Sequence, residues 1–206
     1  IILMILCAIC APLFAQITGH GVNEQFRGSN ALTPEGLPHP PSAEFWFGTD
    51  TLGRDILVRI MYGARYSFLV GVAATALTVV IGVAIGLTAG YFGGWVDTVL
   101  ARLVDLVLSV PFYLVAIALV SIFKPGLMIS ILVIGFFSWA SVARLVRGQV
   151  LSMKEREYVE AARSLGASDS RIMFIDILPN VLAPVIIYAS LLIPVVILTQ
   201  AALSFL

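Results

Sequence analysis

The sequence has few charged side chains and no excess of either sign. Charged residues make up 12% of its 206 positions, and twelve Lys and Arg balance twelve Asp and Glu, so the formal net charge is zero. A protein that binds nucleic acid through its phosphates needs a basic excess, which is missing here. We therefore expect no nucleic acid partner.

Cysteine and histidine, which commonly hold metals, are also scarce. Cys7 and Cys10 lie together in the first apolar run, which favours packing over a disulfide framework or redox chemistry. His20 and His39 lie in a polar stretch without a third ligand at a recognisable spacing, so we expect surface histidines. The sequence predicts no metal and no cofactor.

Catalytic constellations are missing from the apolar segments. An intramembrane hydrolase needs a nucleophile with a base, or two carboxylates at membrane depth, and no apolar segment holds either set. A phosphate-binding loop needs Gly-Lys-Ser/Thr, yet Lys124 follows Phe123 and Lys154 follows Met153. We expect a protein that is not an enzyme and has no ATPase site of its own.

Apolar side chains dominate what is present. They make up 60% of the chain, and the mean hydropathy is +1.02, which is typical of a membrane protein. Charges are avoided at mid-bilayer, so charge-free stretches of at least about 17 residues mark membrane spans. Five such stretches predict an all-α polytopic membrane helix bundle: residues 1–23, 66–96, 106–123, 125–143 and 177–206. The chain opens and closes inside apolar runs, so residues 1–17 are interpreted as a truncated first membrane helix.

Two polar segments separate the spans. Residues 18–66 are rich in Pro, Gly and Asn, which predicts an irregular extracytoplasmic loop. Its last part, from Ile56, repeats apolar residues at helical spacing with Asp55 and Arg59 on the other face as an i,i+4 pair, which predicts an amphipathic interfacial helix. Residues 144–178 hold six basic side chains close to the neighbouring spans, which predicts a cytoplasmic position.

Several features within the spans predict packing details. Lys124-Pro125-Gly126 predicts a tight turn and a helical hairpin. Gly82, Gly86 and Gly90 form a ridge that favours internal helix packing over a gating or dimer surface. Arg102 and Asp105 are favoured as an interfacial pair over a buried pair that lines a path. Kinks or breaks are open possibilities at three prolines: Pro111, Pro184 and Pro194.

A short helix is predicted within the second polar segment. Tyr158, Ala161, Ala162 and Leu165 fall at i, i+3, i+4 and i+7, a narrow apolar stripe, and Gly166 suits the left-handed residue that ends a helix. Glu160 is placed to pair with Arg156 and Arg163 on the polar side. A second short helix should follow, capped by Ser168 or Asp169 and ended before Pro179. So short a helix needs a docking surface, either another protein or its own membrane helices.

These residues carry a family resemblance. Glu160-Ala161-Ala162, then Gly166 and later Leu178-Pro179, resembles the EAA motif of ABC-importer permease subunits. Further motifs resemble the dipeptide/oligopeptide and nickel branch, in particular its C-type permease: Phe47-Gly48-Thr49-Asp50-Thr51-Leu52-Gly53-Arg54-Asp55, Tyr62-Gly63-Ala64-Arg65, Arg144-Leu145-Val146-Arg147-Gly148-Gln149 and Gly166-Ala167-Ser168-Asp169. One departure is Asp176, where the general motif has an apolar residue. The resemblance covers about residues 45–206.

The resemblance implies the fold and the setting. It implies a type I ABC importer fold, in which residues 67–206 form the permease core and 144–178 the coupling segment, with six spans in a complete chain against five here. The implied partners are two cytoplasmic ATP-binding subunits, a homologous second permease, an extracytoplasmic solute-binding protein and membrane lipid, in a bacterial or archaeal inner membrane. The implied contacts with the ATP-binding subunit come from six residues: Tyr158, Glu160, Ala161, Ala162, Leu165 and Gly166.

The implied function is import by alternating access. ATP hydrolysis on the partner subunits would drive uptake of peptides, with nickel or glutathione-type substrates as the alternative within the family. A solitary ion-coupled carrier is a third hypothesis, although such carriers keep ionisable groups near the midplane. The residues of the substrate path stay unassigned.

Overall fold

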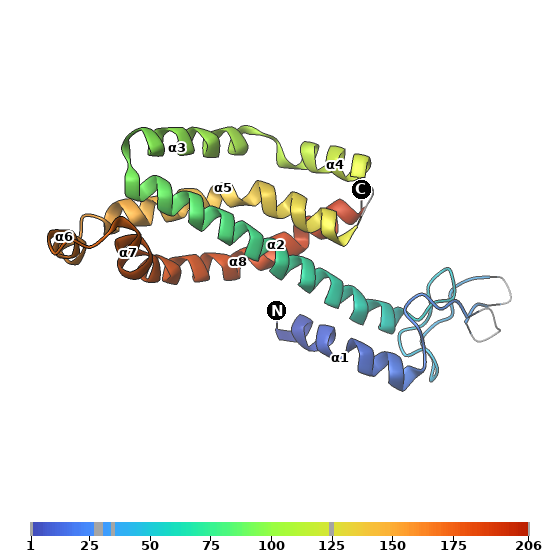
Figure 1. Cartoon of the computed structure of the whole chain (residues 1–206). Coiled ribbons are helices and arrows are strands. Elements are labelled where there is room, and N and C mark those ends of the chain that lie inside the picture. The colour runs from blue at the N-terminus through green and yellow to red at the C-terminus, as the bar shows by residue number, and fades with distance from the viewer. Residues whose placement is uncertain (1, 27–30, 34–35, 124–125, 206) are drawn as a thin grey trace. The chain divides into compact units, whose positions relative to one another are not determined.

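The computed structural model describes residues 2–26, 31–33, 36–123 and 126–205 (Figure 1). The described residues contain no strand beyond two isolated bridges, Leu32 with Pro38 and Thr49 with Asp55. The helices are α1 (Ile2–Thr18), α2 (Ile56–Phe92), α3 (Gly94–Ser109), α4 (Phe112–Phe123), α5 (Leu127–Met153), α6 (Glu157–Ser164), α7 (Asp169–Arg171), the π-helical segment η1 (Ile172–Ile177) and α8 (Leu178–Phe205). The all-α class is confirmed.

The chain forms two compact units, residues 1–69 and 70–206. The long helix α2 belongs to both, since it begins at Ile56 in the first unit and ends at Phe92 in the second. The predicted helix start at Ile56 is confirmed. The predicted boundary at residue 66 is not a helix end, because the backbone stays helical from Ile56 to Phe92.

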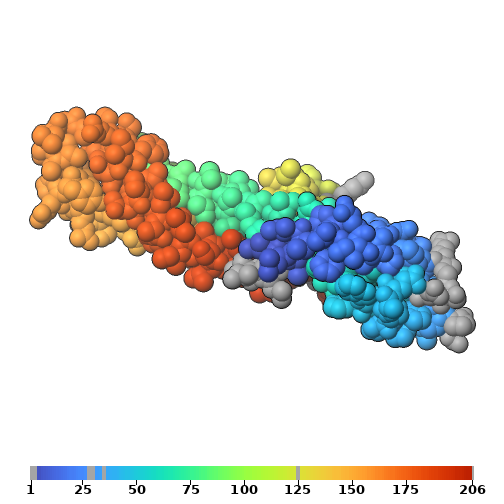
Figure 2. Space-filling view, turned by 90° about the horizontal axis from the view of Figure 1, so that it is seen from below, coloured from blue at the N-terminus to red at the C-terminus, as the bar shows by residue number. Residues whose placement is uncertain are grey.

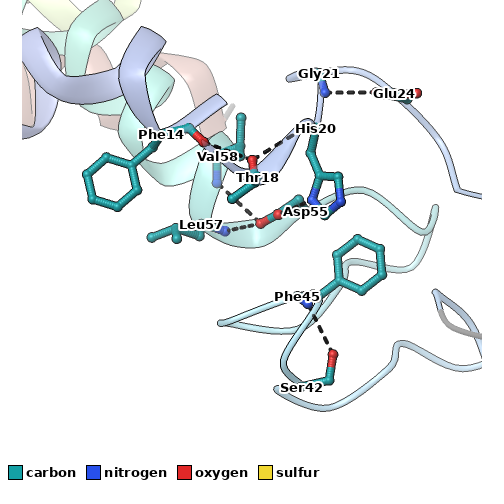
Figure 3. Close-up of polar contacts among 10 residues, drawn as sticks. All are labelled: Phe14, Thr18, His20, Gly21, Glu24, Ser42, Phe45, Asp55, Leu57 and Val58. Carbon is teal, nitrogen blue, oxygen red and sulfur yellow. Dashed lines mark hydrogen bonds and ion pairs between the residues drawn. The ribbon is translucent and has the colours of Figure 1, made fainter. Parts of the chain in front are cut away.

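The polar segment of the first unit is an irregular loop, as predicted, without a helix among its described residues between α1 and α2, but it contains a packed cluster. His20 is 8% exposed and stacks on Phe45, with ring centroids 4.8 Å apart, while Phe26 lies 4.6 Å from His20. The Nδ1 atom of His20 lies 2.7 Å from the Oδ2 atom of Asp55 (Figure 3). We call His20, Phe26, Phe45 and Asp55 the His20 cluster. The surface position predicted for His20 is therefore wrong.

Asp55 caps the start of α2 and does not pair with Arg59. Its Oδ1 atom accepts hydrogen bonds from the backbone N–H groups of Leu57 and Val58, at 2.8 and 3.3 Å, as an N-cap residue does (Figure 3). Arg59 instead forms an ion pair with Asp50, which also binds Arg54. The predicted i,i+4 pair fails because the buried Asp55 side chain turns toward the helix start and His20.

Three described helices are long and apolar enough to cross a membrane: α2, α5 and the continuous run Asp169–Phe205. The bent pair α3 and α4 makes a fourth candidate, and Met4–Thr18 of α1 is a shorter apolar helix. The described residues therefore hold three spanning helices, or four with the bent pair, against the five spans predicted. Residues Lys124 and Pro125 of the predicted tight turn lie outside the described residues, while Gly126 precedes α5.

Pro111 breaks the third run. Helix α3 ends at Ser109 and α4 begins at Phe112, and the two helices are bent by 77° relative to each other. Proline lacks the N–H that a continuing helix would use, and it disfavours helical backbone at the residue before it, Val110. Pro184 and Pro194 lie within α8, which continues through both. The break at Pro111 is visible between α3 and α4 in Figure 1.

The core of the second unit is built where α2 and α5 approach closely. A Cβ atom added at Gly82 would lie 2.6 Å from Val142 Cβ, and one at Gly86 would lie 2.5 Å from the carbonyl oxygen of Ala143. A Cβ atom added at Gly90 would likewise lie 2.7 Å from Val150 Cβ. The glycine ridge therefore packs internally, as expected, because only hydrogen fits between the two backbones.

Three ion pairs involve helix α3. Asp97 pairs with Arg147 of α5, with Nη2 and Oδ2 2.6 Å apart. Asp105 lies 4.0 Å from Arg102 and only 2.8 Å from Arg144 of α5. Arg102 is 80% and Asp105 54% exposed, in keeping with an interfacial pair, and Asp105 also lines a cavity of about 230 Å³ together with Arg144 and Arg147. The two ion pairs between α3 and α5 join residues that are 39 and 50 positions apart in the sequence. Local i,i+3 spacing could not predict such pairs.

The segment after α6 corrects another expectation. Ser168 precedes α7 without a side-chain capping hydrogen bond, and the helix continues through η1 into α8 instead of ending before Pro179. In η1 the hydrogen bonds are those of the wider π-helix, as in the bond from the Leu178 N–H to the Met173 carbonyl. Pro179 lies where this pattern returns to an α-helix, so its missing N–H does not stop the chain.

Candidate functional site

Helix α6 lies between the C-terminal end of α5 and the start of α7, at one end of the second unit (Figure 1). Figure 2 shows this end of the second unit in orange. The eight residues of α6 begin with Glu157 and include Glu160, so negative charge lies near the positive end of the helix dipole. Both carboxylates are exposed to solvent.

Val159 anchors α6 to the rest of the unit. Its side chain is fully buried in the cluster that contains Val146 and Val150 of α5 and Ile172 of η1, and Ala162 packs partly against the same cluster. Sequence analysis missed Val159, although its i,i+3 spacing with Ala162 is itself a helical signal. The predicted stripe therefore splits, since Ala162 faces inward with Val159.

The other three residues of the stripe face away from the chain. Tyr158 is 45% exposed, Leu165 is 89% exposed and Ala161 is exposed as well. We call these three residues the exposed face of α6. An apolar face left open on a helix whose opposite side is anchored is typical of a contact with another molecule.

Gly166 ends α6 as predicted. Its φ is +80°, its N–H bonds to the carbonyl of Arg163, and the N–H of Ala167 bonds to the carbonyl of Ala162 at 3.1 Å. These two bonds form a Schellman motif, which requires a left-handed residue at this position. Glu160, by contrast, forms no ion pair with Arg156 or Arg163 within the described part of the chain.

Two polar contacts fix the segment around α6 to helix α2. The hydroxyl of Tyr91, near the end of α2, lies 2.6 Å from the Oδ1 atom of Asp169 in α7. The Nζ atom of Lys154 donates to the carbonyl of Gly90 over 3.2 Å. Together with Val159, these contacts place the exposed face of α6 on a fixed support.

A hollow of about 760 Å³ lies beside α6. It is lined by Met153, Glu155, Arg156, Glu157, Tyr158 and Asn180. The lining carries both signs of charge around an exposed aromatic ring, so it suits a protein surface better than a small apolar ligand. No group of three or more His, Cys, Asp or Glu in the described ranges is arranged to hold a metal ion.

Comparison with known families agrees with this architecture. The model of the family described as "Binding-protein-dependent transport system inner membrane component" matches residues 82–206, more than half of the chain. The chain belongs to this family. Its membrane fold is that of type I ABC importers, and the chain is a multi-pass membrane protein.

Individual relatives have similar names. The chain is 41% identical over its whole length to the oligopeptide transport system permease protein OppC of Bacillus subtilis (strain 168), of which it covers 64%. It is 43% identical over 98% of its length to the dipeptide transport system permease protein DppC of Alkalihalophilus pseudofirmus, of which it covers 63%. The glutathione transport system permease protein GsiD of Pectobacterium atrosepticum is 39% identical over 88% of the chain and 60% of that protein. The chain thus spans less than two thirds of the length of these relatives.

Proposed function

We propose that the chain is a membrane subunit of an ATP-driven importer that takes up peptides by alternating access. The names of the relatives, which include oligopeptide, dipeptide and glutathione transport permeases, support this substrate class, with glutathione as the alternative within it. In this proposal ATP is hydrolysed by two partner subunits, and the chain has no ATPase site of its own. A second permease, a solute-binding protein and a position in the inner membrane complete the proposal.

The observation that carries this proposal is the division of α6 into an anchored side and an open side. Val159 and Ala162 hold the helix on the core, while Tyr158, Ala161 and Leu165 are left for a partner. In our proposal the ATP-binding subunit covers the exposed face of α6 and the hollow beside it. Exclusion of water from such apolar residues is the main source of binding energy at protein interfaces.

Movement of α6 is then transmitted through the contacts that fix it. When the ATP-binding subunits close, the push on α6 reaches α5 and η1 through Val159, and α2 through the Tyr91–Asp169 hydrogen bond. The Asp97–Arg147 ion pair carries the displacement of α5 to α3. Packed helices linked in this way tilt together, which opens one side of the membrane pathway as the other closes.

Cysteine crosslinking tests the proposal. Ala161→Cys is introduced into the full-length protein, with Cys7 and Cys10 replaced by alanine, and co-expressed with candidate ATP-binding subunits. We expect a crosslink whose yield changes with nucleotide. Arg163→Cys is the matched control. It lies two residues after Ala161, about 200° around the helix, and so on nearly the opposite side from the exposed face of α6.

The outcomes separate the competing functions. A nucleotide-sensitive crosslink at Ala161→Cys, stronger than at Arg163→Cys, supports the coupling role. A thiol at position 161 that reacts freely with water-soluble reagents but never crosslinks contradicts it. Peptide uptake that persists in membranes lacking ATP-binding subunits would favour a solitary carrier.

A further inference from the structure

The break between α3 and α4 opens onto a cavity of about 240 Å³. Val110 and Phe112 line it at the break, and Phe137 of α5 forms another side. Three hydroxyl groups also line it: Ser138 and Ser141 from α5, and Tyr188 from α8. We call this space the hydroxyl cavity. All its lining residues belong to the second unit.

The three hydroxyls have no hydrogen-bond partner among the described residues. Serines in membrane helices commonly bond to the carbonyl four residues earlier, as Ser121 does with Ile117 at 2.8 Å and Ser190 with Ile186 at 2.7 Å. Ser138 and Ser141 do not form this bond, so both hydroxyls are available to the cavity. Ser141 is exposed and Ser138 and Tyr188 are half-buried, so all three hydroxyls are open to water or to a ligand in the cavity.

The broken helix adds polar backbone to the same place. At the end of α3 the Leu106 carbonyl accepts from the Ser109 hydroxyl at 2.7 Å and the Val107 carbonyl from the Val110 N–H at 3.4 Å, while the first N–H groups of α4 have no preceding helical turn to bond to. Irregular backbone within a membrane protein is tolerated where it lines a polar cavity. The described lining residues of the hydroxyl cavity carry no charge.

We propose that the hydroxyl cavity is a contact site for the transported peptide, and that Ser138, Ser141 and Tyr188 hydrogen-bond to its main-chain amide groups. This proposal rests on the proposed function and assigns part of its substrate path. Neutral hydroxyls recognise the amide group that every peptide carries, whereas charged side chains would select particular sequences. The volume is below that of a drug-sized pocket, about 300 to 1,000 Å³, so the cavity holds a part of the peptide, not the whole.

Removal of the hydroxyls tests this role. The triple variant Ser138→Ala, Ser141→Ala, Tyr188→Phe is assembled with its partner subunits and solute-binding protein in vesicles, and uptake of labelled dipeptides and tripeptides is measured. Each hydrogen bond lost from the path corresponds to about a fivefold effect, so we expect at least a tenfold fall in kcat/KM at equal permease amount. The matched control is Ser121→Ala with Ser190→Ala, whose hydroxyls already bond within their own helices and should leave uptake unchanged.

Thiol protection gives a second readout. With Cys7 and Cys10 replaced by alanine, Ser141→Cys should react with a water-soluble maleimide, and saturating peptide with its binding protein should slow that reaction at least threefold. Ser190→Cys should show no peptide effect. A peptide-independent reaction at Ser141→Cys, or none at all because lipid fills the cavity, overturns the proposal.

The two proposals fail in different ways. If the unmodified importer takes up no peptide, the proposed function is wrong. If it takes up peptide and the triple variant matches it in kcat/KM, the function stands and the assignment of the hydroxyl cavity is wrong.

Discussion

The two polar segments of this chain are held in place by different kinds of buried contact. In the first, aromatic rings and a buried acid close on one another in the His20 cluster, which leaves Asp55 only 1% exposed. In the second, Val159 is buried while Tyr158 and Leu165 stay exposed. The first segment also exposes apolar side chains, such as Trp46 at 50% and Phe47 at 54%, but its buried centre contains the polar pair of His20 and Asp55. The buried side of α6 is wholly apolar, so polar contacts hold the first segment and apolar packing holds the second.

The largest effect is expected at the buried polar pair of the first segment. Asp55→Ala removes the partner of His20 and the cap of α2, and we expect a loss of about 3 kcal/mol in stability of the first unit. Hydrogen exchange of the amides of Leu57 and Val58 measures it. Asp105→Ala is the control, because its ion pairs are exposed and should contribute less than about 1 kcal/mol. Equal effects of the two substitutions would contradict the structural role of the His20 cluster.

The second segment should separate folding from coupling. Val159→Ala removes two buried methyl groups, so we expect the α6 region to lose about 1.6 kcal/mol, measured by hydrogen exchange of α6. Leu165→Ala, at an exposed site, should leave that exchange unchanged and reduce ATP-driven uptake. If Leu165→Ala lowered stability as much as Val159→Ala, the division of α6 into two sides would be incorrect.

A smaller effect is expected at the end of α6. Gly166→Ala places a side chain on a backbone with φ of +80°, which should cost about 1 kcal/mol. The expected result is fraying of the last turn of α6 with a weaker crosslink at Ala161→Cys. Gly148→Ala is the control, since this exposed helical glycine has ordinary backbone geometry and open space around it. Unchanged crosslinking in Gly166→Ala would show that the Schellman motif is dispensable.

The smallest effect concerns pH and the first segment. Burial by itself raises the pKa of Asp50. Hydrogen bonds from the backbone N–H groups of Arg54 and Leu52 and from the Arg54 side chain together outweigh burial, so the pKa is lowered from its ordinary value of 3.8. Because the pKa of Asp50 is lower in the folded loop than in the unfolded chain, its ionised carboxylate stabilises the fold at any pH above the unfolded-state pKa. This stabilisation is lost as the pH falls through the pKa of the folded state. The stability difference between wild type and Asp50→Asn should therefore shrink below about pH 4, as measured by proteolysis of the loop. A difference that stays constant with pH would contradict this assignment.

The sequence predicted local features well because neighbouring residues decide them. The helix start at Ile56, the end of α6 at Gly166 and the glycine ridge each depend on backbone geometry or side-chain size at the positions themselves. The pairing of Asp55 was predicted incorrectly, because its partner His20 lies 35 residues away. An Asp directly before an apolar helical run was nevertheless a readable signal for a capping role.

The sequence by itself determined the membrane class, the helical spans and the family, because hydropathy and short motifs are properties of adjacent residues. Only the tertiary structure decided that Val159 faces the core while Tyr158 and Leu165 face outward. It also decided that Ser138, Ser141 and Tyr188 share one cavity beside the break at Pro111. The physical reason is that periodicity shows which residues share a helix face, whereas burial depends on which other helix packs against that face.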